Sequence, residues 1–157
     1  LAQGSVDMAC GWGGALRRMK ESGNILLTGA EKEELGILVF DVTSSPADFV
    51  AGHEDMVAKF LKVTAEANAM WADEANHAKM LPVIAKDAGM SEDDAKGSLS
   101  TFGFPSVEDQ LSGKWLGGGA QDFMKGVADV FVAAESIDAA KASYAENVNT
   151  GPLSAAK

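Results

Sequence analysis

The chain has 157 residues, of which 46% are hydrophobic and 23% are charged, and its formal net charge is −10. This composition is typical of one globular domain and excludes a chain that is disordered throughout. The excess of acid leaves no basic stripe that could neutralise successive phosphates. Nucleic acid is therefore excluded as a partner, and an anionic membrane surface is disfavoured.

The single cysteine and the first residues bear on two questions: the redox compartment of the protein, and whether the chain is part of a longer one. Cys10 is the single cysteine, so an internal disulfide is impossible and the redox compartment stays open. The chain begins at Leu1 without the basic and apolar regions of a secretory leader, and no apolar run reaches the roughly 20 residues needed to span a bilayer. We expect the chain to be a segment cut from a longer protein.

The N-terminal part has the pattern of a strand, a helix and a second strand. Residues 6–12 form a mostly apolar run between glycine-rich flanks, which predicts a buried strand. A helix is expected next, ending at Ser22-Gly23-Asn24, and residues 25–27 predict a second buried strand. This order is typical of a βαβ unit in a parallel sheet, which needs neighbouring strands.

The remainder changes from strand to helix. Residues 35–44 are the longest β-like stretch, with alternating side chains and Asp41 in its interior. A helix is predicted to begin at Ser45-Pro46, and apolar residues recur at helical spacing between Glu54 and Asp73. Ser91 and Ser106 each precede acidic residues as helix caps do, and residues 123–134 predict another amphipathic helix.

The familiar motifs of nucleotide and metal chemistry are incomplete. The glycines at 11–14 lack the third glycine of a dinucleotide fingerprint, since Leu16 stands there. No metal-ligand spacing joins Cys10, His53 and His77. Cys10 is interpreted as a small core residue and the histidines as surface residues, so we predict no metal site, no cofactor and no catalytic residue.

Trp12 and Asp41 are the two candidate binding residues. Asp41 interrupts an apolar predicted strand, where an unpaired carboxylate would be costly unless a cation or hydrogen-bond donors meet it. Trp12 ends a predicted strand just before a glycine turn, and ligands of open α/β sheets bind outside such ends. The alternative is a core tryptophan and an aspartate paired with an internal Arg or Lys.

Two stretches of the chain resemble the periplasmic taurine- and sulfonate-binding proteins of ABC importers. The first reads GSVDMACGWGGAL at 4–16 and KESGNIL at 20–26, similar to the family's G-D-[IV]-D-A-A-x-x-W-x-P-A-[LV] and K-x-G-K-V-L. The second reads FDV at 40–42 and ADFVAGHEDMVAKF at 47–60, similar to L-D-V and K-D-F-A-E-K-H-P-E-V-V-K-A-F. Order and spacing agree over roughly the first 60 residues.

The resemblance implies an α/β fold, namely the C-terminal part of a two-lobed, type II periplasmic-binding-protein fold that is rich in helix. It implies that residues 1–34 end the second lobe as strand, helix and strand. Residues 35–44 would be the crossing hinge strand, and residues 45–157 the helical C-terminal part of the first lobe. Such proteins close their two lobes on a ligand in the cleft between them.

The function that the resemblance implies is transport rather than catalysis. The chain would be a periplasmic substrate-binding protein that captures taurine or a related amino-sulfonate and delivers it to the membrane permease of an ABC transporter. Trp12 would line the cleft, and Asp41 would accept hydrogen bonds from the ligand's ammonium, which selects amino-sulfonates over plain sulfonates. Gly14 and Thr43 depart from the family pattern beside these positions and leave the exact ligand open.

Two other function classes remain open. One is an enzyme similar to the pyrimidine synthase of thiamine biosynthesis, which shares the fold and uses His, Cys and iron; iron in the protein would favour it. The other is a helical protein-interaction module with an acidic surface. Such a module should unfold cooperatively as a monomer, whereas half of a clamp should expose apolar surface and self-associate.

Overall fold

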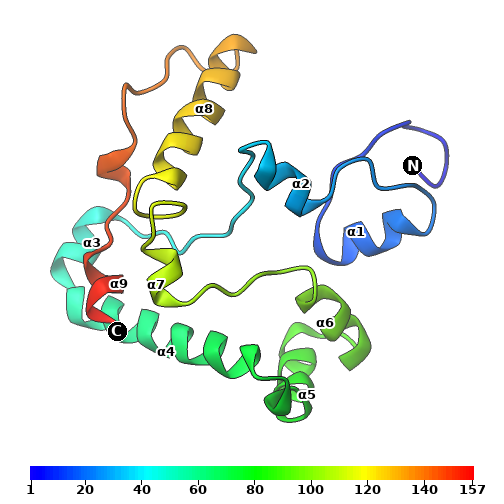
Figure 1. Ribbon diagram of the computed structural model, residues 1–157, viewed down its shortest axis with the longest axis horizontal. Coiled ribbons are helices and arrows are strands. Elements are labelled where there is room, and N and C mark those ends of the chain that lie inside the picture. Colours follow the sequence, from blue (N-terminus) through cyan, green and yellow to red (C-terminus); the bar gives the residue numbers. More distant parts are fainter. The chain divides into compact units, whose positions relative to one another are not determined.

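A computed structural model describes residues 1–157, and it is helical, with 57% of the chain in helix and no β-strand (Figure 1). The α-helices in chain order are α1 Gly13–Lys20, α2 Gly29–Glu34, α3 Ala47–Gly52, α4 Glu54–Ala72, α5 His77–Ala88, α6 Glu92–Leu99, α7 Val107–Gln110, α8 Gly119–Ala133 and α9 Gly151–Ala155. Two short 3₁₀ helices, η1 Glu74–Asn76 and η2 Ala145–Asn147, complete the set.

The predicted α/β, type II fold is therefore wrong. Residues 6–12, 25–27 and 35–44 form no strand, and side chains such as Val6, Leu26 and Val39 are exposed. The physical reason is that a β-ladder needs a second segment to accept its backbone hydrogen bonds, and a parallel sheet also needs cover on both faces. Here these segments meet no partner strand, so residues 35–44 connect α2 to α3 as irregular chain.

The predicted helices are confirmed at several places. α1 follows the glycines at 13–14, α4 covers the stretch from Glu54, and α8 covers most of residues 123–134. The helix predicted at Ser45-Pro46 begins one residue later than expected, because Pro46 rather than Ser45 is the N-cap of α3. Helical spacing is a short-range signal, which explains why these elements were predictable.

The chain divides into two compact units, and α4 contributes to both of them. Unit 1 comprises residues 1–28 and 69–104, and unit 2 comprises residues 29–68 and 105–157. The predicted boundaries at residues 34 and 44 stay a prediction.

The core of unit 1 lies between α5 and α6. Leu81, Ala85 and Ala95 are buried, and the half-buried Trp71 and Leu99 pack against them together with Ile84. Gly89 ends α5 in the left-handed conformation at φ 64°, which glycine adopts without a Cβ penalty. Its turn lets the chain reverse at once into α6, so the two helices share one small core.

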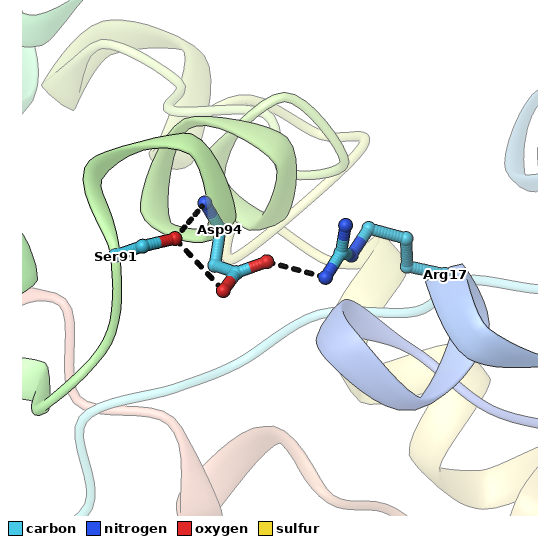
Figure 2. Close-up of polar contacts among 3 residues, drawn as sticks. All are labelled: Arg17, Ser91 and Asp94. Atoms are coloured by element: carbon cyan, nitrogen blue, oxygen red, sulfur yellow. Dashed lines mark hydrogen bonds and ion pairs between the residues drawn. The ribbon is translucent and has the colours of Figure 1, made fainter.

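A capped helix start attaches α1 to α6, as Figure 2 shows. The Asp94 backbone N–H donates to Ser91 Oγ over 3.1 Å, and Ser91 Oγ donates to Asp94 Oδ2 over 2.8 Å. The other carboxylate oxygen of Asp94 accepts from the Arg17 guanidinium of α1. One aspartate therefore closes the first turn of α6 and also holds α1, the helix that begins directly after Trp12.

Unit 2 is organised by small buried residues and by aromatic contacts. Ala120 and Ala128 of α8 are buried, as are Pro152, Leu153 and Ala156 at the C-terminal end. Lys114 Nζ donates to Glu33 Oε2 over 2.8 Å, which ties α2 to the loop before α8. Many large apolar side chains stay exposed in this unit, so its core is smaller than its hydrophobic content would allow.

Candidate functional site

Trp12 occupies the N-cap position of α1 with extended backbone angles, φ −142° and ψ 170°. Its carbonyl accepts the first helical hydrogen bond, from Leu16 N over 3.2 Å. Gly13, at φ 54°, follows it in a conformation that disfavours residues with a side chain. The indole is 75% exposed and is not a core side chain, so it is accessible to a ligand or a partner.

Asp41 lies in the irregular connection between α2 and α3, and it is exposed. The carboxylate makes no hydrogen bond or ion pair. The sequence argument that burial would force a partner on Asp41 is therefore wrong, because water solvates the charge at no desolvation cost. The alternative of an internal Arg or Lys partner is wrong for the same residue, and the carboxylate is free to accept donors from outside.

The two candidate residues belong to different units. Trp12 is part of unit 1, held in place through the contact of α1 with α6, and Asp41 is part of unit 2. Within each unit the structure leaves the Trp12 indole and the Asp41 carboxylate exposed. Their assignment to one ligand stays a prediction.

An aromatic cluster next to Asp41 was missed by the sequence reasoning. The Phe40 ring meets Trp115 edge to face at 5.9 Å between centroids, and it meets Phe123 in the same way at 6.1 Å. Such pairs stabilise a fold beyond the area they bury. The sequence pattern that could have indicated this packing is the alternation of residues 35–44. It puts Phe40 and Asp41 on opposite sides of the chain. Phe40 anchors the connection, and Asp41 faces solvent.

The cluster borders an open apolar hollow of about 370 Å³ in unit 2. Its walls come from Phe40, from the α8 side chains Phe123, Val127 and Phe131, and from Ile137 and Tyr144. These walls offer almost no polar group, and ligand sites need a few polar groups to orient what they bind. The hollow therefore gives apolar contact and no basis for recognising a charged solute.

The nucleophile and imidazole candidates are dispersed. Cys10 is a free, exposed thiol, so its interpretation as a core residue is wrong. His53 ends α3 and meets Phe49 edge to face at 4.6 Å. His77 is half-buried and stacks on Trp71, although it was expected on a helix surface. No three His, Cys, Asp or Glu side chains are grouped as metal ligands would be.

No protein-family model, curated protein or solved structure matches this chain. The structure adds that none of its helices combines the length and the apolar character needed to cross a membrane. The two sequence motifs and the exposed Trp12 and Asp41 side chains are therefore the features that bear on function.

Proposed function

We propose that this chain acts in the uptake of a small amino-sulfonate, of which taurine is the type, as the periplasmic solute-binding component of an ABC importer. It binds its ligand without chemical conversion and hands it to a membrane permease. The observation that carries the proposal is the agreement in order and spacing of two motifs over residues 4–60, with Trp12 in the first and Asp41 in the second. The proposal makes no use of an α/β fold.

Asp41 supplies the contact that distinguishes this ligand class. Its carboxylate is exposed and makes no ion pair, so it is free to accept hydrogen bonds from an ammonium group. Hydrogen bonds between opposite charges are about twice as strong as neutral ones. A carboxylate also repels sulfonates that lack an ammonium, which selects against them. The sulfonate end of the ligand has no assigned partner in this chain.

Trp12 supplies an aromatic face on which the ammonium group and the alkyl carbons of the ligand can lie. Its indole is accessible, and its backbone is held at the start of α1 by the hydrogen bond to Leu16. A cation over an indole face gains about 0.5–2 kcal/mol, depending on how far it is desolvated. The residue therefore adds affinity, while the carboxylate sets the requirement for an amine.

Calorimetric titration with three ligands tests the proposal. Taurine carries both charges, ethanesulfonate lacks the ammonium, and 3-aminopropanoate replaces the sulfonate by a carboxylate. We expect tight binding of taurine, and we expect Asp41→Asn to weaken it by about 10- to 100-fold. The same substitution should strengthen ethanesulfonate binding, because it removes the repulsion between the carboxylate and the sulfonate.

Asp138→Asn is the matched control, because it removes one exposed carboxylate outside the two motifs. It should leave taurine binding unchanged. If Asp41→Asn weakens taurine and ethanesulfonate equally, Asp41 does not hold the ammonium. If none of the three ligands binds, the importer function itself is wrong.

A further inference from the structure

Helix α4 exposes an apolar stripe with the spacing of a coiled-coil seam. Met56, Phe60 and Val63 are 52%, 58% and 64% exposed, and Ala67 continues the same line on the surface. The steps between these residues are four, three and four. Apolar residues that repeat in this way keep facing one partner helix, as the a and d positions of a heptad do.

The stripe is separate from the half-buried face of α4. Val57, Leu61 and Ala65 are half-buried and lie on a different side of the helix. A surface helix of a globular protein normally has one apolar face and a polar opposite face. α4 has a second apolar face, and large apolar patches on a surface mark sites of interaction.

Two charges flank the stripe on the same side. In the heptad Phe60 and Ala67 take the a positions. Lys59 directly precedes Phe60, and Glu66 directly precedes Ala67. Both side chains are exposed, and neither forms an ion pair in the structure. The flank is therefore basic in its first half and acidic in its second half. When a second copy of the helix lies antiparallel to the first, each basic half faces an acidic half.

We propose that α4 pairs antiparallel with α4 of a second copy of this chain. In this pairing Met56 meets Ala67 of the second copy, and Phe60 meets Val63 of the second copy, each contact occurring twice by symmetry. Lys59 then lies beside Glu66 of the second copy, again twice. The partner helix is α4 of a second copy because the apolar stripe and its two flanking charges match the same stripe and charges on an antiparallel copy.

The charges also decide the direction. In a parallel pair Lys59 would face Thr64 of the second copy, and Glu66 would face Trp71, so no ion pair would form. The seam covers only about two heptads, and short helices gain little from pairing, so we expect a dimer with a dissociation constant on the order of 10–100 µM. This inference does not depend on the proposed ligand, and it is tested with no ligand present.

Sedimentation equilibrium of the chain, from about 5 to about 500 µM, measures the association. Lys59→Glu and Glu66→Lys should each weaken it by about tenfold, because each places like charges side by side twice. The double variant K59E/E66K should regain the affinity of the original chain. An equimolar mixture of the two single variants should form a heterodimer, because every flanking pair is then oppositely charged.

Lys62→Glu is the matched control. It reverses a charge on the exposed surface of α4 away from the stripe and should leave the association unchanged. Phe60→Glu should abolish the association by placing a carboxylate in the seam, and circular dichroism should show unchanged helix content for every variant. A chain that stays monomeric at all concentrations would overturn the proposal. So would an association that ignores Phe60→Glu, or single variants that form no heterodimer.

Discussion

The imidazole of His77 lies flat against the indole of Trp71, with ring centroids 3.8 Å apart and planes inclined by 13°. His77 Nε2 is also 2.8 Å from the Trp71 carbonyl oxygen, so this nitrogen carries the proton and donates to it. Asn76 Nδ2 donates to the Met70 carbonyl over 3.0 Å. Side chains of the next turn thus satisfy carbonyls at the end of α4, which would otherwise lack helical partners.

Replacing His77 by Ala should destabilise unit 1, because the change removes both the stacking and the hydrogen bond to the end of α4. The expected loss is about 1–2 kcal/mol in the free energy of unfolding, measured by urea denaturation followed by circular dichroism. His53→Ala is the control, since His53 is exposed and meets only the edge of Phe49. Equal effects of the two substitutions would contradict this role for His77.

Leu81 and Val83 lie two residues apart on α5 and differ in burial. Leu81 belongs to the core of unit 1, whereas Val83 is 67% exposed. Leu81→Ala should cost about 2–4 kcal/mol because it removes buried methyl groups and leaves a cavity. Val83→Ala should change the free energy of unfolding by less than about 0.5 kcal/mol. Urea denaturation of both variants checks which face of α5 is buried. A larger loss of unfolding free energy for Val83→Ala than for Leu81→Ala would contradict this placement.

Arg17 and Asp94 form an ion pair whose side chains are 57% and 42% exposed. Solvent screens such a pair, so a double-mutant cycle with Arg17→Ala and Asp94→Ala should give a coupling of less than about 1 kcal/mol that falls further at high salt. Ser91→Ala should cost about 1 kcal/mol at any salt concentration, because it removes the cap of α6. Thermal unfolding at low and high salt separates the two effects. If the stability loss caused by Ser91→Ala depended on salt, the assignment of Ser91 as a cap would be contradicted.

Trp12 should matter for binding and not for stability. Because its indole is exposed, Trp12→Ala should leave the unfolding midpoint unchanged, while weakening taurine by about 3- to 30-fold in calorimetric titration. Trp115→Ala is the informative contrast, since Trp115 contacts Phe40 and its loss should destabilise unit 2. An unfolding midpoint lowered by Trp12→Ala would show that the indole is part of the packing.

The helix caps show what sequence reasoning could predict. Ser91 with Asp94, and Ser106 with Asp109, were expected to begin helices, and in both the serine Oγ accepts from the backbone N–H three residues later. The extent of α4 was expected from its apolar spacing. These features involve residues within one or two turns of each other, so the amino-acid order contains all the partners.

Most of the missed features involve partners that are distant in sequence; the stacking of His77 on Trp71 is the local exception. Whether residues 6–12 and 35–44 form strands depends on another segment meeting them, and the structure shows none. The same holds for Phe40 against Trp115 and for Arg17 against Asp94. Local sequence patterns were sufficient for α1, α4 and α8, for the two serine caps and for the two motifs that suggest a ligand. Which apolar segments are covered follows from the three-dimensional packing, because burial depends on neighbours that local patterns do not specify.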